Sequence, residues 1–354
     1  MHRRSLRAIT IALTMSVTAF GVAACGSSSD KSSSSSSSSS TAAKPAGKKI
    51  KVGLVTDIGG LNDRSFNALA NKGLEDAKSQ LGIDGRVLIS KSNADYVPNL
   101  TTLAQQKYDL VIAVGFLMAD ATATVAKKFP NVKFAIIDSS APGLKGAPKN
   151  AEGLLFKEQE AGYLAGYAAG LYAKDNNAKV ISSVGGQKIP PVDHYIAGYQ
   201  AGAKKADPSI KTTNAYSQDF VDQAKCKEIA LNQIAAGSKV VFQVAGQCGL
   251  GALDAAKEKG VQGIGVDADQ SYLGPQVFTS ALKKVDVAVL DAIKRAQAGQ
   301  FAGGTDLTAT VKNGGIGVGK FNTAGSKYAD QVKQVQDQIS SGQISSIPDT
   351  VAGK

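Results

Sequence analysis

Three aspartates stand directly after apolar runs, at the positions where buried strands would end. Asp57 follows KVGLVT, Asp138 follows KFAII and Asp267 follows GIGV. A single aspartate in such a place can open a turn or cap a helix, which would be a structural role. Three carboxylates that face one cleft are costly to bury unless hydrogen-bond donors meet them. Hydroxyl and amino groups of a small polar ligand would supply those donors, so the pattern indicates a binding site.

Aromatic, basic and amide side chains lie close to the same strand ends. Phe66, in DRSFN, and Phe220, in YSQDFVDQAK, each begin a predicted helix, so one ring from each half of the chain could hold a planar ligand between them. Phe66 also begins an apolar stripe at helical spacing, which leaves a core role open. Lys283, in TSALKK, could reach a ligand oxygen or be an exposed lysine. Asn62 shares the loop that follows Asp57 and is a further candidate.

The segments that must position these residues alternate between strand and helix. Mostly continuous apolar runs, such as DLVIAVGF and KVVFQVAG, are typical of parallel strands that are covered on both faces. They occur in two successive sets with amphipathic helices between them, which predicts an α/β protein of two doubly wound, Rossmann-like lobes. Ligands of such sheets bind just beyond the carboxyl ends of the strands, so we expect a site in an interlobe cleft.

The chain is expected to cross between the two lobes more than once. The segment VFTSALKK follows the second set of strands and precedes another amphipathic helix, and we interpret it as a return to the first lobe. The first lobe would then comprise residues 50–153 and 281–310, and the second lobe residues 154–280 and 311–354. The crossings would form a hinge beside the cleft.

Signatures of catalysis, cofactor binding and nucleic-acid binding are missing from the sequence. There is no G-x-x-x-x-G-K-[ST] or G-x-S-x-G motif, and His194 is the one histidine beyond the first few residues. The nearest dinucleotide motif starts at Gly249 and has Asp254 where a glycine is needed, and an acid there would repel a pyrophosphate. The formal net charge is +11, but the lysines do not cluster with aromatic residues into a nucleic-acid module. We therefore expect no enzyme, no cofactor, no metal and no nucleic-acid partner.

The sequence of the first 49 residues predicts that the protein is exported and anchored to a membrane. Residues 1–24 combine three arginines, a short apolar run and small residues directly before Cys25, which resembles a bacterial lipobox and predicts a lipidated Cys25. Ordinary cleavage with an incidental cysteine is the alternative, and the adjacent arginines leave a twin-arginine signal open. Residues 25–49 are Ser-rich and have too little apolar surface for a core, so we expect a flexible tether. The protein would then be anchored on the extracytoplasmic face of the cell membrane.

Cys226 and Cys248 are the cysteines that remain once Cys25 carries a lipid. Outside the cytoplasm such an even pair predicts a disulfide. Closing a loop of this length would stabilise the fold by about 3 kcal/mol in the chain-entropy model. A zinc site would need further ligands that the sequence does not offer.

Several longer motifs occur in order between about residues 51 and 322: VTDIGGLNDRSFN, VGFLMAD, FAIIDSS, GLLFKEQEAGYLAGYAAG, VGGQKIPPVDHYIAGYQAG, GIGVDADQS and VFTSALKKVDVAV. They resemble the basic membrane protein family of substrate-binding lipoproteins, the PnrA-like purine nucleoside receptors of ABC importers. The resemblance implies a type I periplasmic-binding-protein fold, in which two lobes close on a ligand. It also implies an ABC permease as partner.

The resemblance assigns residues to the ligand site as well. In nucleoside-binding members of the family the base stacks between two phenylalanines, and acids with a lysine hold the base edge and the ribose. Asp267 and Lys283 match the pair that faces the ribose. The residues that match the family site are Asp57, Phe66, Asp138, Phe220, Gly246, Asp267 and Lys283.

The sequence as a whole predicts a receptor that captures a nucleoside, most readily a purine nucleoside, and delivers it to a permease. Three acids in the cleft would repel a triphosphate, which favours nucleosides over nucleotides. A receptor of the same fold for a sugar or another small polar solute, and a ligand sensor that does not transport, are alternatives. A nucleoside hydrolase would need a cluster of acids around Ca²⁺, and Asp267 with Asp269 is too sparse for that.

Overall fold

The computed structural model describes residues 48–352. The predicted signal segment, the predicted lipidation site at Cys25 and nearly all of the predicted tether lie outside these residues. Pro45–Lys354 belong to one compact unit, and the buried apolar core of the described residues lies within it. This unit therefore has the hydrophobic core that an independently folding domain needs. Within the described residues, none of the helices has the length and apolar character that crossing a bilayer requires.

The first lobe is built on a six-stranded sheet, here the first sheet. Its strands all pair in parallel, in the order β11-β5-β4-β3-β1-β2. They are β1 (Lys51–Val55), β2 (Asp84–Leu88), β3 (Leu110–Ala113), β4 (Lys133–Ile137), β5 (Ala151–Phe156) and β11 (Asp306–Ala309). The helices of this lobe are α1 (Phe66–Leu81), α2 (Tyr96–Gln105), α3 (Ala119–Lys128) and α8 (Val285–Gln297). Both faces of the central strands are covered, which explains their continuous apolar sequences.

The second lobe repeats this plan around a second six-stranded sheet. The order is β12-β10-β9-β8-β6-β7, in which β12 pairs antiparallel with β10 and the other pairs are parallel. The strands are β6 (Val180–Gly185), β7 (Lys211–Tyr216), β8 (Ser238–Val244), β9 (Gln262–Asp267), β10 (Val277–Lys283) and β12 (Ile316–Val318). The helices are α4 (Glu158–Asp175), α5 (Pro190–Ala206), α6 (Gln223–Ala235), α7 (Gly249–Lys259) and α9 (Ala329–Ser340).

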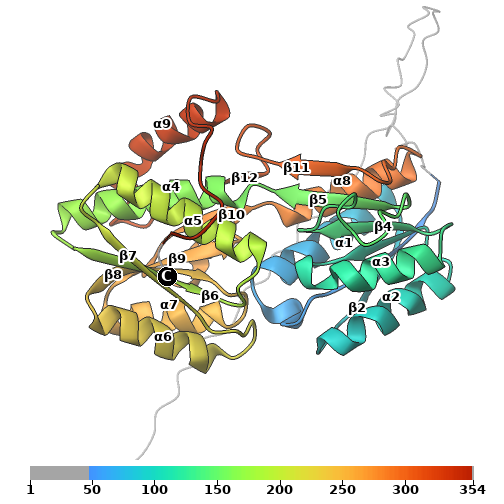
Figure 1. Cartoon of the computed structure of the whole chain (residues 1–354), viewed down its shortest axis with the longest axis horizontal. Coiled ribbons are helices and arrows are strands. Elements are labelled where there is room, and N and C mark those ends of the chain that lie inside the picture. The colour runs from blue at the N-terminus through green and yellow to red at the C-terminus, as the bar shows by residue number, and fades with distance from the viewer. Residues whose placement is uncertain (1–47, 353–354) are drawn as a thin grey trace, which may run out of the picture. The chain divides into compact units, whose positions relative to one another are not determined.

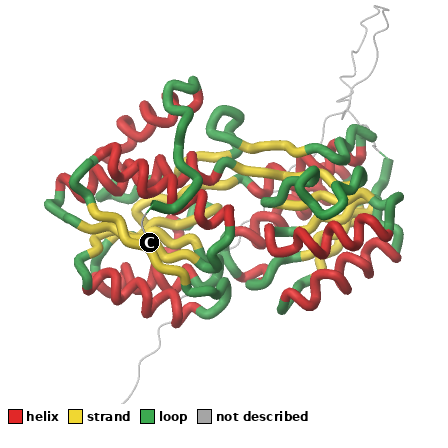
Figure 2. The backbone as a smooth tube through the Cα atoms, viewed as in Figure 1, coloured by secondary structure: helices red, strands yellow, loops and turns green. Residues whose placement is uncertain are grey.

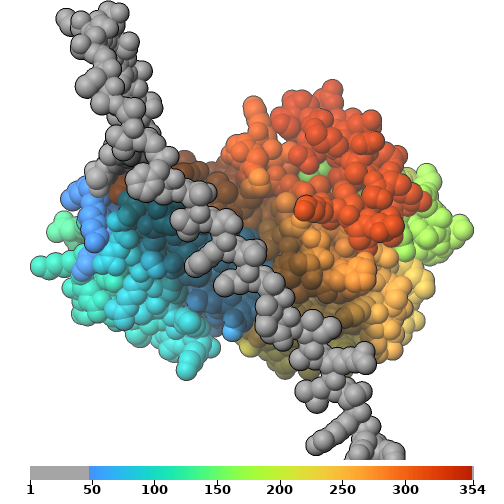
Figure 3. Space-filling model, turned by 180° about the vertical axis from the view of Figure 1, so that it is seen from behind, coloured from blue at the N-terminus to red at the C-terminus, as the bar shows by residue number. Residues whose placement is uncertain are grey.

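The two sheets can be followed separately in Figure 1, and Figure 2 shows the strands of each lying between helices. Figure 3 shows the carboxyl-terminal segment, orange to red, over the second lobe, where α9 packs on α4. Short 3₁₀ helices occupy several of the connections that follow a strand: η1 (Gly60–Asn62), η2 (Asn93–Asp95), η3 (Phe116–Met118), η4 (Ser271–Leu273) and η5 (Ser326–Tyr328). The architecture is that of two doubly wound α/β lobes.

The chain crosses between the lobes after β5, after β10 and after β11. The sequence-based borders need correction at two of these places, because 153/154 falls inside β5 and 280/281 falls inside β10. The segment VFTSALKK does not return to the first sheet, since β10 pairs with β9 and β12. The return begins with α8, which packs on α1, where Lys72 Nζ lies 3.0 Å from Asp286 Oδ2.

Candidate functional site

A cavity lies beyond the carboxyl ends of β1, β4, β8 and β9, with lining residues from both lobes. It holds about 610 Å³ of space free of protein atoms, counting the part that is open to solvent. The predicted site residues that line it are Asp57, Phe66, Asp138, Phe220, Gly246, Asp267 and Lys283. Asn62 does not belong to it, because its side chain is exposed at the end of η1.

Asp57 follows β1 and is held by a fixed set of donors. The Tyr96 hydroxyl and the Ile58 backbone N–H both donate to Asp57 Oδ1, the latter at 2.7 Å. The backbone N–H of Asp57 donates to Asn67 Oδ1 at 2.8 Å, which ties the strand end to α1. Burial raises the pKa of the Asp57 carboxyl to about 6, against the effect of these hydrogen bonds. Among the residues that the structure describes, no donor lies within hydrogen-bond distance of Oδ2, so this oxygen is available to a ligand.

Phe66 is the first residue of α1, and its ring is partly buried against the core while also lining the cavity. Asp63 fixes the start of this helix by accepting the backbone N–H groups of Asn67 at 2.7 Å and Ala68 at 3.0 Å. Gly115 makes room beside the ring. A Cβ there would lie 2.6 Å from Asp57 Oδ2 and 3.3 Å from Phe66 Cε1, and its φ of 112° also favours glycine.

Asp138 and Asp267 occupy corresponding places in the two lobes. Asp138 follows β4 with φ 67°, and Asp267 ends β9 with φ 61°, so both adopt the left-handed backbone that non-glycine residues rarely take. Such strain is found most often where a side chain must be aimed at a functional site. Burial raises the pKa of the Asp138 carboxyl to about 7 and also raises the pKa of Asp267.

Lys283 ends β10 and brings a buried ammonium group into this cluster. Its Nζ lies 2.6 and 2.7 Å from the two carboxylate oxygens of Asp138 and 3.0 Å from Glu158 Oε1. The same atom lies 5.0 Å from the centroid of the Phe66 ring and 4.8 Å from that of Phe156, which are cation–π distances. Burial alone would lower the pKa of Lys283, but the surrounding carboxylates more than offset this and raise it.

Glu158 is a member of the cluster that the sequence did not single out. It begins α4, and its Oε2 lies 3.2 Å from His194 Nδ1 on α5. Burial works against its charge, but Lys283 and His194 hold the pKa of Glu158 below its usual range, and the same contact raises the pKa of His194. Close packing of α4 on α5 fixes this geometry, since a Cβ at Gly162 would lie 2.1 Å from the Tyr195 carbonyl oxygen.

Phe220 supplies the aromatic ring of the second lobe. A Cβ at Gly186 would lie 2.3 Å from the ring, so a glycine is required for the ring to adopt this position. Gly246 lies beside the same residue with φ 54°. The backbone N–H of Cys248 donates to the Phe220 carbonyl oxygen at 3.1 Å, which links the ring's loop to the start of α7.

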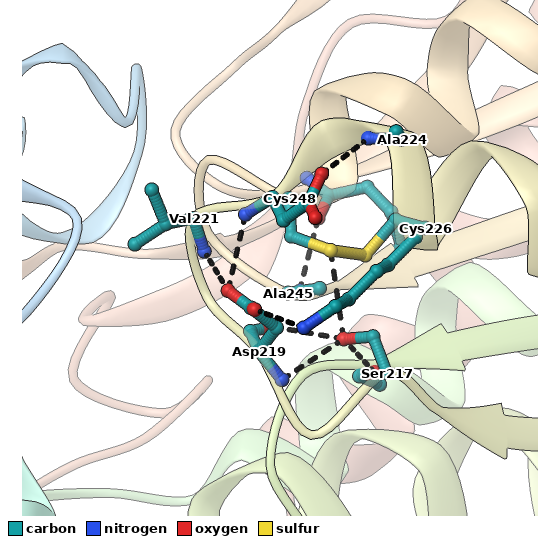
Figure 4. The surroundings of a disulfide bond; sticks show 11 residues. Ser217, Asp219, Val221, Ala224, Cys226, Ala245 and Cys248 are labelled. Atoms are coloured by element: carbon teal, nitrogen blue, oxygen red, sulfur yellow. Dashed lines mark hydrogen bonds and ion pairs between the residues drawn. A yellow bond between two sulfur atoms is a disulfide. The ribbon is translucent and has the colours of Figure 1, made fainter.

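The predicted disulfide is present: Cys226 and Cys248 are bonded, with their Cα atoms 5.5 Å apart. Figure 4 shows that the bond lies beside the loop with Asp219 and Val221, and Phe220 stands between these two residues in the sequence. In that loop Asp219 accepts from the Val221 backbone N–H at 2.8 Å and from Lys225 Nζ at 2.7 Å. The cross-link and these hydrogen bonds together hold the second-lobe half of the cavity.

Direct contacts also join the two lobes at the cavity. The Ser65 hydroxyl donates to Asp267 Oδ2 at 2.8 Å, and Gln270 Nε2 donates to the Arg64 carbonyl oxygen at 3.2 Å. The Tyr195 hydroxyl donates to Asp267 Oδ1 at 3.0 Å. Asp267 thus accepts a hydrogen bond from each lobe. The lobes are therefore in contact around the cavity, as in a closed receptor.

A family model for ABC transporter substrate-binding proteins of the PnrA-like type matches residues 50–350. The chain belongs to this family. The members of this family are solute-binding receptors rather than enzymes, and this protein is one of them.

Individual relatives of this PnrA-like protein span most of its length. A nucleoside-binding ABC transporter protein, BmpA of Lactococcus lactis, is 36% identical over 317 residues, which cover 83% of this chain and 88% of the relative. An uncharacterized lipoprotein of Pyrococcus abyssi is 37% identical over 286 residues, covering 77% and 70%. Among solved structures, an ABC transporter solute-binding protein of Aeropyrum pernix superposes with a TM-score of 0.77 at 27% identity, covering 84% and 94%. These likenesses agree with a type I solute-binding fold.

Proposed function

We propose that this protein is a lipid-anchored, extracytoplasmic receptor that captures a purine nucleoside and delivers it to an ABC permease. The observation that carries the proposal is the pairing of Phe66 and Phe220, one from each lobe, with the carboxylate of Asp57 in one cavity. A base between the two rings gains apolar burial and stacking energy. The nucleoside-binding relative from Lactococcus lactis supports the same ligand class.

The polar groups of the cavity favour a neutral ligand with hydrogen-bond donors. Asp57 Oδ2 has no donor in the described part of the protein. A charge-assisted hydrogen bond to it from a ring N–H or an amino group would be roughly twice as strong as a neutral one. Asp138 and Lys283 form a buried ion pair beside the Phe66 ring, where ribose hydroxyls can both donate and accept. A phosphate would meet the carboxylates of Asp57, Asp138 and Asp267, so nucleotides are disfavoured.

The first test is calorimetric titration of residues 45–354 with adenosine, guanosine, inosine, cytidine and ribose. The protein is first unfolded and refolded, which removes any ligand acquired during production. We expect one-to-one binding of a purine nucleoside, weaker binding of cytidine because of its smaller ring, and no response to ribose alone. Binding of ribose without any nucleoside would point to a sugar receptor, and silence from all nucleosides would contradict the proposed ligand.

The stacking role of Phe66 is tested by Phe66→Leu, which keeps apolar volume against the core but removes the ring. We expect nucleoside affinity to fall at least about tenfold, because a lost ring contact costs about 1.4 kcal/mol or more. The matched control is Phe321→Leu, a partly buried ring of the second lobe that does not line the cavity. If Phe66→Leu leaves the affinity unchanged while reducing stability as the control does, the ring serves the core alone.

A further inference from the structure

A groove at the amino ends of the first-sheet strands carries an excess of positive charge. We call it the basic groove, and its lysines are Lys48, Lys107, Lys128 and Lys133. It lies where β1, β3 and β4 begin, whereas the ligand cavity lies beyond their carboxyl ends. The groove and the cavity are thus at opposite edges of the same sheet. In Figure 3 the blue start of the described chain lies at the outer edge of the first lobe.

The lysines of the basic groove have no ion-pair partner among the described residues. None of its four lysines forms an ion pair there, and three of them are exposed while Lys133 is half-buried. The lining includes one acid, Asp109, whose Oδ2 already accepts the backbone N–H of Lys51 at 2.8 Å. A surface of this kind attracts a partner with several negative charges.

Aromatic rings lie among these lysines. Phe129 and Tyr108 line the groove, and Lys128 Nζ lies 5.8 Å from the centroid of the Phe129 ring. Lys133 Nζ lies 5.7 Å from the centroid of the Phe301 ring. Basic side chains beside aromatic ones are typical of surfaces that rest at the headgroup level of a bilayer.

The described chain also starts at this groove. Lys48 is part of the lining, and its carbonyl oxygen accepts a hydrogen bond from Gln297 Nε2 at 3.1 Å, which fixes the start of the chain to the end of α8. Residues 26–47 separate it from Cys25, and a stretch of that length spans at most roughly 75 Å. A lipid on Cys25 would therefore keep the basic groove within reach of the bilayer.

We propose that the basic groove binds anionic phospholipid headgroups of the membrane to which the protein is anchored. Binding there places the outer edge of the first lobe on the bilayer and leaves the cavity at the far edge of that sheet accessible to solute. It also gives the four groove lysines a function, which ligand capture in the cavity does not. The surface is separate from the cavity, so its test is independent of the nucleoside proposal.

The test measures sedimentation of residues 45–354, which lack Cys25, with vesicles at low ionic strength. We expect binding to phosphatidylcholine vesicles that contain phosphatidylglycerol, little binding to phosphatidylcholine alone, and loss of binding as salt rises. Replacing the four groove lysines by glutamine should weaken binding at least about tenfold, since each lysine near an anionic surface contributes separately. The variant is Lys48→Gln/Lys107→Gln/Lys128→Gln/Lys133→Gln.

The matched control removes the same charge from the corresponding edge of the second lobe. The control variant is Lys204→Gln/Lys205→Gln/Lys211→Gln/Lys239→Gln. These four lysines are exposed and form no ion pair among the described residues. The control should keep most of the binding, and both variants should unfold like the unmodified chain. If both variants lost vesicle binding equally, the net charge of the protein and not the basic groove would account for binding, which would overturn the proposal. Absence of binding to phosphatidylglycerol vesicles would also overturn it.

Discussion

Replacing Lys283 by methionine is expected to lower the free energy of unfolding by about 3–5 kcal/mol at neutral pH. Methionine has a similar length, so the loss comes mainly from the charge. The Lys283 ammonium lies within 2.7 Å of both Asp138 oxygens and 3.0 Å from Glu158 Oε1 in a buried setting. Without it the buried carboxylates of Asp138 and Glu158 face each other without the shared ammonium, although Glu158 keeps its contact with His194. Urea unfolding of residues 45–354, followed by circular dichroism, measures the difference.

The direction of the pH dependence follows from the pKa shifts. The pKa of Lys283 is raised above its ordinary 10.5, so the lysine contributes stability below that value for as long as its carboxylate partners stay ionised. The pKa of Glu158 is lowered from 4.5, so its share of the stability is present above that pH and is lost as the pH falls further. In Lys283→Met the two carboxyl groups bind protons instead. The deficit of the variant should therefore be largest at neutral pH and shrink toward pH 4.5 and below.

Two further variants separate the charge from simple packing. Lys284→Met alters the next residue, whose side chain is exposed and forms no ion pair among the described residues, and it should change stability by less than about 0.5 kcal/mol. Adding Asp138→Asn and Glu158→Gln to Lys283→Met should recover a large part of the loss, because the unpaired charges are gone. Equal stability of Lys283→Met and Lys284→Met would show that the buried cluster is not held by the ammonium.

The location of the site and most of its residues could be predicted, because the sheet topology determines where those residues lie. Parallel strands bring their carboxyl ends to one edge, so residues as far apart as Asp57 and Asp267 meet without any local signal that links them. The positions of Phe66 and Phe220 could be predicted for the same reason, since each lies a few residues beyond the end of a strand and close to the helix that follows. The shared cavity confirms this placement, while their role in binding stays a prediction.

Glu158 shows what sequence reasoning could not reach. An acid at the start of a helix is common, because it complements the helix dipole, so Glu158 in FKEQEAG gave no distinct signal. Glu158 belongs to the site because it contacts Lys283, which lies far along the chain at the end of β10. Tyr96 and Tyr195, which donate to Asp57 and Asp267, are hidden in the same way, because a buried tyrosine hydroxyl needs a partner that only the fold identifies.

The two errors have related physical causes. The strand VFTSALKK has the right composition for either sheet, and apolar pattern alone does not tell which neighbour it pairs with. Asn62 was chosen for its loop, but the turn through Gly59 and Gly60 exposes it and directs Asp63 and Asn67 inward instead. A difference of one residue in a tight connection reverses the direction of a side chain.

Asp57→Asn is expected to stabilise the ligand-free protein while weakening nucleoside binding. Burial raises the pKa of Asp57 from 3.8 to about 6, so the folded state holds this proton more tightly than the unfolded chain. The free energy of unfolding of the wild type therefore falls as the pH rises between those values. Keeping the ionised carboxylate buried above pH 6 costs up to about 3 kcal/mol, which the neutral amide avoids.

The comparison is made by urea unfolding of wild type and Asp57→Asn near the two ends of this pH range. The two should be nearly equally stable at pH 3.8, and the variant should be more stable above pH 6. Tyr96→Phe is the informative second variant. The Tyr96 hydroxyl lowers the pKa of Asp57, so removing it should extend the falling limb of the wild-type profile to higher pH.

Ligand binding should respond in the opposite sense to stability. Losing a charge-assisted hydrogen bond to Asp57 Oδ2 costs about 1.5–3 kcal/mol, so purine nucleoside affinity of Asp57→Asn should fall by roughly ten- to a hundredfold. A variant that is both more stable and a weaker binder would mean that the fold keeps a costly buried charge for its ligand. If the variant bound as tightly as wild type, the carboxylate would have no part in recognition. If the stability of Asp57→Asn did not differ from that of the wild type above pH 6, burial of the ionised Asp57 carboxylate would not destabilise the fold.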